Sequence, residues 1–198
     1  MAPLPFSDPG ARIAFDVLLV VWVLGELWIR VRTRRNRRES RPVDQGSMLL
    51  VIALVAAGVG GAFLLAGDVH GAAIAHARWV LFALGLVLMG GGIAIRQWAV
   101  AVLGRFFTID VRVQPGQAVV DSGPYRWVRH PSYTGLILTF VGIGLALGNW
   151  AALALVTVVP TVGLLVRIRV EERALVEGLG EPYRRFAANR PRLFPGIW

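Results

Sequence analysis

Apolar stretches long enough to cross a lipid bilayer limit this chain to one class of fold. A transmembrane helix needs about 20 mostly apolar residues, and residues 12–30, 47–66 and 79–103 each meet or approach that length. Because 56% of the 198 residues are hydrophobic, a water-soluble core is the weaker explanation. The sequence therefore predicts an all-α, polytopic integral membrane protein with a single domain over residues 1–198.

A fourth apolar stretch, residues 133–166, is too long for one span and is interrupted by Gly-Asn-Trp at 148–150. At 1.5 Å per residue each half is about 24 Å long, so the simplest structure is a helical hairpin with Asn149 forming hydrogen bonds at its tip. We expect about five transmembrane helices, the last two forming this hairpin. Residues 171–188 are polar and aromatic and predict a helix at the membrane surface, which the prolines that follow it end.

The basic residues are all arginine and fall at one end of the predicted spans. The chain carries 21 of them and a formal net charge of +9. Seven lie in residues 30–41, four in residues 104–129 and seven after Val166, whereas residues 68–78 hold one. Because arginine-rich segments stay in the cytoplasm, we expect an extracytoplasmic N-terminus and a cytoplasmic C-terminus in the cell (inner) membrane. Membrane lipids are the expected partners of these arginines, and nucleic acid is not.

Several other features predict no chemistry of their own. The chain has no cysteine, which excludes disulfides, thiolate metal ligands and a cysteine nucleophile. His70 and His76 lie six residues apart in a loop, and we expect no metal site there. The glycine clusters at residues 58–61 and 90–92 follow no predicted strand, so they predict close helix packing and not a nucleotide-binding loop.

Three charged residues, Asp16, Glu26 and Arg96, lie inside predicted spans. Charges within a membrane are costly and commonly mark functional sites. Structural alternatives stay open for two of them. Glu26 could pair with Arg30 one helical turn later, and Arg96 either extends to the membrane surface or lines a cavity. The sequence leaves the roles of all three open.

Residues 123–133, GPYRWVRHPSY, form the most informative polar segment because they lead directly into the fourth apolar stretch. A loop anchored at the membrane surface explains the first arginine and the tryptophan. It does not explain why His130, Pro131 and Tyr133 open the next helix. Proline favours a first helical turn, and the backbone amides there favour an anion. We therefore predict a small-molecule site for a carboxylate or phosphate beside His130 and Tyr133.

A second polar segment, residues 167–172 (RIRVEE), follows the last apolar stretch. Arg167 and Glu171 are one helical turn apart and share a helix face. Taken alone, this spacing favours an ordinary structural ion pair. If residues 133–166 fold back as a hairpin, however, Glu171 is expected to lie beside His130.

Together these segments resemble the isoprenylcysteine carboxyl methyltransferase family. The matching motifs are GPY at 123–125, RHPSY at 129–133, Gly135, EE at 171–172, RQWA at 96–99 with LG at 103–104, and LGEPY at 179–183. The resemblance covers about the C-terminal half of the chain. The first two spans match the family only in being apolar, so the three spans in residues 1–103 rest on their hydropathy. The resemblance implies that residues 104–198 form the half that binds the cofactor and carries catalysis.

The resemblance further implies a membrane enzyme that uses S-adenosylmethionine, enclosed by the cytoplasmic ends of the last helices. The implied cofactor-binding residues are Gln117, Ala118, Val119, Val120, Tyr125, His130, Pro131, Ser132, Tyr133 and Glu171. Arg167 is implied to contact the substrate. Gln117 stands where animal members have histidine, so the family's side-chain role at that position is not carried over.

The chemistry of methyl transfer suits these residue types. Displacement at a sulfonium is an in-line reaction, in which the protein mainly aligns the reacting groups. A substrate carboxylate, with a pKa of about 4, is ionised at neutral pH and needs no general base. Arg167 offers a planar fork that fits a carboxylate. Glu171 would balance that charge or accept a hydrogen bond from the cofactor's ammonium group, so Arg167 and Glu171 are the predicted catalytic residues.

The expected reaction is carboxyl O-methylation of an isoprenylcysteine-like acid whose apolar tail enters from the bilayer between helices. Three alternatives stay open: a phosphatidylethanolamine N-methyltransferase, which would need a base, an NADPH-dependent sterol-type reductase with a related Arg-His-Pro segment, and a non-catalytic scaffold. The arginine-only, alanine- and glycine-rich composition suggests a GC-rich bacterial genome, in which the acceptor could be a small lipophilic acid or another lipid. Small-residue helix faces fit internal packing and dimer contacts equally well.

Overall fold

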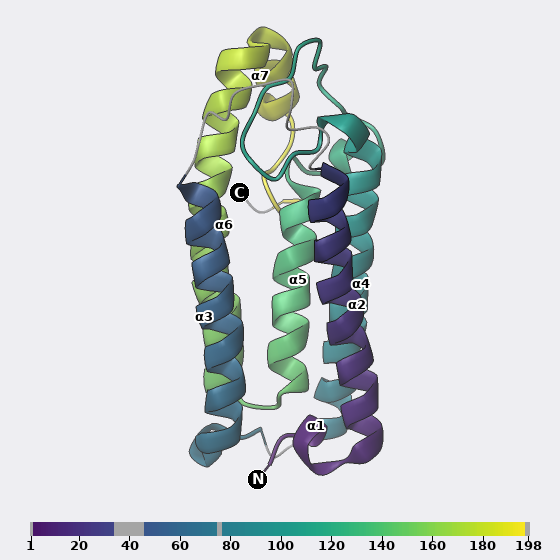
Figure 1. Ribbon diagram of the computed structural model, residues 1–198, viewed down its shortest axis with the longest axis vertical. Helices are drawn as coiled ribbons and strands as arrows, with labels where there is room; N and C mark the ends of the chain where they lie inside the picture. Colours follow the sequence, from purple (N-terminus) through teal and green to yellow (C-terminus); the bar gives the residue numbers. More distant parts are fainter. Residues whose placement is uncertain (1, 34–45, 75–76, 197–198) are drawn as a thin grey trace.

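The computed structural model describes residues 2–33, 46–74 and 77–196, which form a helical bundle (Figure 1). Its α-helices are α1 (Leu4–Ser7), α2 (Pro9–Thr33), α3 (Ser47–Asp68), α4 (Arg78–Leu103), α5 (Pro131–Ala146), α6 (Trp150–Leu179) and α7 (Glu181–Ala188). Short 3-10 turns, η2 (His70–Ala72), η3 (Gly104–Phe106) and η4 (Gly123–Arg126), lie in the loops. The described part of the chain contains no β-strand, only an isolated bridge between Ala73 and Asn149. The all-α prediction is confirmed.

The long helices α2, α3, α4, α5 and α6 run along the length of the bundle (Figure 1). By length and composition, the candidate membrane spans are Ser47–Asp68, Arg78–Phe106 and Trp150–Leu179. α5 is apolar but has only 16 residues, and α2 has 25 residues that include acidic and basic side chains. The polytopic membrane fold is confirmed, with α5 shorter and α2 more charged than an ordinary span.

Exposed tryptophans indicate how the bundle sits in a bilayer. Trp79 lies at the start of α4 and Trp98 near its end, and both are about half exposed. They are 19 positions apart in the sequence, which corresponds to a helical rise of about 28 Å, close to the hydrocarbon thickness of about 30 Å. Tryptophan favours both membrane surfaces. The loop between α4 and α5, together with α7, gathers at the Trp98 end of the bundle (Figure 1).

Glycines allow α4 and α5 to pack with their backbones in contact. A Cβ atom on Gly92 would lie 2.5 Å from the carbonyl oxygen of Gly135, and one on Gly142 would lie 2.5 Å from the Met89 nitrogen. Neither position has room for a methyl group. Small residues of this kind let membrane helices approach closely and gain dispersion contacts. The predicted packing role is confirmed for Gly92, whereas Gly91 has nothing within 4 Å.

The turn between α5 and α6 confirms the predicted hairpin and the role of Asn149. Gly148 has a φ of +60°, a conformation that glycine adopts at little cost. Asn149 caps α6 by accepting a hydrogen bond from the Ala152 amide at 3.1 Å. Its Nδ2 also donates to the Val69 carbonyl at 2.9 Å. One buried side chain therefore closes the hairpin and ties it to the end of α3.

The two arms of the hairpin differ in length, contrary to the sequence prediction. α5 has 16 residues, whereas α6 continues for 30 residues to Leu179. The single surface helix predicted over residues 171–188 was wrong, because its first half is the end of α6. Helix α6 ends before Gly180, where φ is +63°, and α7 then begins with a proline in its first turn. Tyr183 and Phe186 bury the inner face of α7.

Candidate active site

A cavity opens at the Trp98 end of the bundle and is lined by α2 to α7 and the loop between α4 and α5. Its empty volume, including open solvent at the mouth, is about 1260 Å³. The predicted site residues that line it are Gln117, Ala118, Val119, Val120, Tyr125, His130, Ser132, Tyr133, Arg167 and Glu171. Pro131 lies behind the wall, buried as the first residue of α5. The hairpin thus brings the two polar segments of the sequence together.

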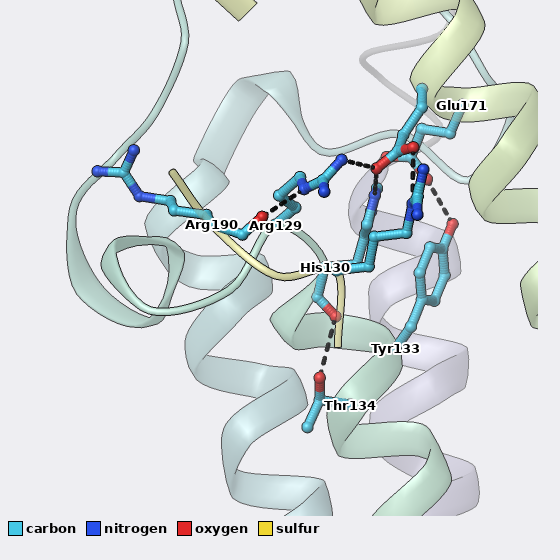
Figure 2. A network of polar contacts seen from close by, with 8 residues as sticks. Arg129, His130, Tyr133, Thr134, Glu171 and Arg190 are labelled. Atoms are coloured by element: carbon cyan, nitrogen blue, oxygen red, sulfur yellow. Dashed lines mark hydrogen bonds and ion pairs between the residues drawn. The ribbon is translucent and has the colours of Figure 1, made fainter. Parts of the chain in front are cut away.

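The first turn of α5 meets α6 through a tyrosine and a glutamate. The Tyr133 hydroxyl donates a hydrogen bond to Glu171 Oε2 at 2.7 Å. The ring of His130 stacks on that of Tyr133, with centroids 5.6 Å apart and an interplanar angle of 24°. Figure 2 shows Tyr133 pointing from α5 toward Glu171. The carboxylate of Glu171 is therefore held at the cavity wall by a partly buried phenol.

The sequence predicted that Glu171 would lie beside His130, but the acid that contacts His130 is Glu172. Glu172 Oε1 lies 3.3 Å from His130 Nε2 and accepts a hydrogen bond from Arg129 Nη1 at 2.7 Å. Its Oε2 accepts one from Arg192 Nε at 2.9 Å. Successive residues of an α-helix point about 100° apart, so Glu171 faces the cavity while its neighbour faces the loop. Glu171 therefore lines the cavity, whereas Glu172 is a structural residue that pairs with Arg129, His130 and Arg192. We call Glu172 the hub residue.

The C-terminal segment, residues 190–194, crosses the start of α5, which the sequence did not predict. The amides of Arg129 and His130 donate to the carbonyls of Pro191 and Arg192, both at 2.9 Å. The Tyr133 amide donates to the His130 carbonyl at 3.0 Å. Backbone carbonyls thus occupy these three amides, so an anion at the start of α5 would have to be held by other groups.

Arg96 lines the cavity and forms an intramembrane ion pair. Its Nε donates to Glu26 Oε1, its Nη2 to Glu26 Oε2 at 2.7 Å, and its Nη1 to Ser132 Oγ at 2.7 Å. Glu26 therefore pairs with α4 and not with Arg30 of its own helix. Burying a guanidinium requires a carboxylate partner, which explains the pairing across helices. Asp16 instead pairs with Arg12 on the exposed side of α2 and does not line the cavity.

Arg167 projects into the cavity from α6 and is 3% exposed. Its Nη1 donates to Ser47 Oγ on α3 at 2.8 Å, and its Nη2 donates to the Ile109 carbonyl in the loop. The guanidinium thus connects α3, α6 and the loop. The sequence indicated Arg167 but not the residues it bonds, because loop residues 104–122 carry no motif that predicts their course.

The phenols of two tyrosines at the site stay protonated at ordinary pH, because burial raises their pKa values. Burial, and secondarily the charge of Glu171, raises the pKa of the Tyr125 phenol well above its usual range. Its hydroxyl donates to the Ala99 carbonyl at 3.3 Å. Burial likewise raises the pKa of Tyr183. Both rings pack with Ala99 and Phe186 in a small apolar cluster beside the cavity, so Tyr125 is a wall residue held by packing.

Two sequence predictions, on the loop that holds His70 and His76 and on the arginine-rich segment 30–41, fall wholly or partly outside the described residues. In the described residues, no group of three or more histidine and acidic side chains is close enough to hold a metal ion. His76 lies outside the described residues. Residues 34–45, which hold most of the arginines of the 30–41 segment, lie outside them as well.

The fold and the site define a polytopic membrane protein with an arginine- and glutamate-lined cavity at one end of its helical bundle. The sequence model of the isoprenylcysteine carboxyl methyltransferase (ICMT) family matches residues 72–177. That is more than half of the chain, which therefore belongs to this family. The match covers both polar segments but ends before the LGEPY motif, and α2, which supplies Glu26, lies outside it.

Individual relatives agree with this assignment. The chain is 37% identical over 83 residues to the uncharacterized protein YpbQ of Bacillus subtilis, covering 42% of this chain and 49% of that one. It is 31% identical over 122 residues to protein-S-isoprenylcysteine O-methyltransferase B of Arabidopsis thaliana, covering 61% and 62%. It is also 30% identical over 121 residues to steroid 5-alpha-reductase DET2 of Solanum lycopersicum, covering 61% and 44%. The chain thus spans about half to three fifths of the length of these proteins.

A solved structure has the same fold. The eukaryotic intramembrane Ras methyltransferase ICMT matches with a TM-score of 0.65 and 22% identity, covering 92% of this chain and 66% of that one. Because the match extends over nearly all of this chain, it includes α2 and α3, which the family model leaves out. At this identity the likeness establishes the fold alone.

Proposed function

We propose that this chain is an S-adenosylmethionine-dependent methyltransferase that methylates the carboxylate of a lipophilic, isoprenylcysteine-like acid. One observation carries the proposal: Arg167, Glu171 and Tyr133 line one cavity that joins the membrane surface to the apolar interior of the bundle. Membership of the family supports the reaction class, and similarity to the Arabidopsis protein-S-isoprenylcysteine O-methyltransferase supports the acceptor class.

The lining of the cavity suits S-adenosylmethionine in chemistry, because it places charged and apolar side chains side by side. Glu171 is placed to accept a hydrogen bond from an ammonium group, while Val119, Val120 and Leu175 offer apolar surface to an aromatic ring. When bound, the cofactor supplies an electrophilic sulfonium methyl group.

Arg167 is the residue that we assign to the acceptor carboxylate. It is buried and held on two sides by Ser47 and Ile109, so its orientation is fixed before an acceptor binds. A preorganised guanidinium in a site of low dielectric binds a carboxylate more strongly than one in water. Because that carboxylate is already ionised at neutral pH, the residues around it need only orient it and exclude water.

The apolar tail of the acceptor has a matching wall. On the side that faces the bundle interior, the cavity is lined by Ile29 of α2, Met48 and Val51 of α3, Leu136 of α5 and Leu164 of α6. Each CH₂ group transferred from water to such a surface contributes roughly 0.8 kcal/mol. An acceptor with a carboxylate at one end and a prenyl chain at the other fits both zones of the cavity.

The orientation of the chain is part of the proposal. The arginine-rich segments flank the end of the bundle at which the cavity opens, and such segments favour the cytoplasm. The cavity would then face the compartment in which S-adenosylmethionine is made. A protease-sensitive tag on the C-terminus should be protected in intact spheroplasts and cleaved in inverted membrane vesicles. The opposite result would contradict this orientation.

Methyl transfer by the purified protein in lipid nanodiscs tests the activity. With S-adenosylmethionine labelled in the methyl group, we expect label in an N-acylated S-prenylcysteine as a base-labile methyl ester. The rate should be nearly flat from about pH 6 to 9, because the acceptor carboxylate stays ionised across that range. A rate that increases with pH, with label in phosphatidylethanolamine, would instead identify an N-methyltransferase.

Calorimetry with the two candidate cofactors separates the remaining alternative. The similarity to the tomato steroid 5-alpha-reductase is the observation that keeps a reductase under consideration. We expect saturable binding of S-adenosylmethionine and none of NADPH. Binding of NADPH alone would refute the proposed methyltransferase.

A further inference from the structure

A chain of hydrogen bonds crosses three helices at one wall of the cavity. It starts at Glu26 on α2, passes through Arg96 on α4 and ends at Ser132 on α5, and all three residues line the cavity. The two carboxylate oxygens of Glu26 accept from Nε and Nη2 of Arg96, which leaves Nη1 to donate to Ser132 Oγ at 2.7 Å. The guanidinium is thus fixed in one orientation.

The Gln97 side chain of α4 lies against α2 beside the ion pair, since a Cβ atom on Gly25 would lie 2.7 Å from Gln97 Nε2. Ionisable side chains within membrane spans are costly and commonly mark functional sites.

The Ser132 hydroxyl accepts a hydrogen bond from Arg96 but does not donate one to any described residue. A serine hydroxyl both donates and accepts hydrogen bonds, and Arg96 can only donate to it. The hydroxyl hydrogen must therefore point elsewhere, and among the described residues none accepts it. Ser132 is 6% exposed and lines the cavity. Since buried polar groups are normally paired, the cavity is where an acceptor for this hydrogen would lie.

The guanidinium makes this hydroxyl a strong donor. A donated hydrogen bond from a cation polarises the hydroxyl that accepts it and strengthens the next bond in the chain. Such a donor, fixed in place and buried, favours an anionic oxygen over a neutral one. Glu26 neutralises the Arg96 guanidinium and orients it so that Nη1 points at Ser132 Oγ. Glu26 therefore acts on the ligand only through Arg96 and Ser132.

We propose that the Ser132 hydroxyl binds a carboxylate oxygen of a ligand in the cavity, with Glu26 and Arg96 as positioning residues. This inference rests on the proposed function, which supplies two ligands that carry a carboxylate. One is the methyl donor, through its amino-acid portion, and the other is the acceptor. Both share the chemistry that the chain of hydrogen bonds recognises, and the experiment separates them.

The test compares two ligands that differ in the carboxylate. S-adenosylhomocysteine contains the amino-acid portion of the donor, and methylthioadenosine lacks it. If the donor is the source, Ser132→Ala and Glu26→Gln should each weaken S-adenosylhomocysteine binding by about 10-fold, the value of one hydrogen bond to a charged group. Methylthioadenosine binding should not change. Asp16→Asn is the matched control, because it neutralises an acid of α2 that is far from the cavity wall.

If the acceptor is the source, both nucleosides should bind as they do to the wild type. The KM for an N-acylated S-prenylcysteine should then rise by about 10-fold with little change in kcat. In either case the two substitutions should act on one interaction, so that the double variant is no worse than the worse single variant. Glu26→Asp should restore part of the loss, because it retains the charge.

Three results would overturn the proposal. Unchanged affinity and unchanged KM in Ser132→Ala would remove the hydroxyl from the site. Equal weakening of both nucleosides, together with a lower melting temperature in Glu26→Gln, would reduce the pair to a structural one. A wild-type protein that binds neither nucleoside would refute the proposed function and this inference with it, whereas either of the first two results in a protein that binds S-adenosylhomocysteine would refute this inference alone.

Discussion

Tyr133 and Glu171 join the two arms of the hairpin across the cavity, with the phenol donating to the carboxylate at 2.7 Å. The contact links residues that are 38 positions apart and lie on different helices. Through this contact the α5–α6 hairpin forms one wall of the cavity. The hydrogen bond from Tyr133 therefore fixes the position of the Glu171 carboxylate, and this position determines which ligand groups the carboxylate can contact.

Removal of this phenol should weaken donor binding more than it alters the fold. Tyr133→Phe leaves Glu171 without its buried donor, and loss of a hydrogen bond to a charged group costs about 1.5–3 kcal/mol. We expect the Kd for S-adenosylmethionine, measured by calorimetry, to rise by roughly 10- to 100-fold. An unchanged Kd would show that Glu171 does not need Tyr133 to face the ligand.

Tyr183→Phe is the matched substitution in the same cavity. The Tyr183 hydroxyl is buried and has no hydrogen-bond partner among the described residues. Removing an unsatisfied buried hydroxyl is expected to be neutral or stabilising. The melting temperature of Tyr183→Phe in detergent should therefore equal or exceed that of the wild type. A clear decrease would mean that the hydroxyl bonds to a water or lipid group.

Arg167→Ala should remove most turnover while donor binding survives. The variant loses the guanidinium assigned to the acceptor carboxylate, and we expect kcat/KM to fall by about 100-fold or more. Arg167→Lys should recover only part of the loss, because an ammonium lacks the planar fork. Arg169→Ala, exposed two residues later on the same helix, is the control and should behave as the wild type. Near-normal turnover of Arg167→Ala would remove this residue from the mechanism.

Glu172→Gln should destabilise the protein without acting directly on the ligand. Glu172 is 13% exposed and contacts Arg129, His130 and Arg192. Breaking a buried charge network of this kind costs about 3–5 kcal/mol. Thermal unfolding in detergent should show a decrease of several degrees, whereas Glu171→Gln should mainly weaken donor binding. Similar melting curves for the two variants would contradict the division between hub and cavity residue.

The sequence predicted the parts of this structure whose signals are local. The break at residues 148–150 and the capping chemistry of asparagine together indicate the hairpin and its tip, because both act within a few residues. The two polar segments likewise predict a shared site once the hairpin is accepted. Arg167 and Glu171 were found in this way, and both line the cavity.

Long-range relationships were not predictable in the same way. The pairing of Glu26 with Arg96 spans 70 positions and depends on which face of α2 meets α4. The choice between Glu171 and Glu172 depends on the rotation of α6 about its axis, which packing sets and spacing does not. The C-terminal segment over α5 uses backbone carbonyls, which any sequence supplies. No single-sequence signal distinguishes these cases.

The contact between α4 and α5 should tolerate no side chain at Gly92. A methyl group there would lie 2.5 Å from the Gly135 carbonyl and 2.6 Å from Thr139 Oγ1, and neither backbone can move without shifting Arg96 or the start of α5. Overpacking of this kind typically costs about 1–3 kcal/mol. Gly91→Ala adds the same methyl group where nothing lies within 4 Å, and the helix propensity of alanine makes it neutral or slightly stabilising. In thermal unfolding we therefore expect Gly92→Ala to melt several degrees below Gly91→Ala, with weaker donor binding because Arg96 and Ser132 move apart. Equal melting temperatures would mean that the two helices separate in the membrane without cost.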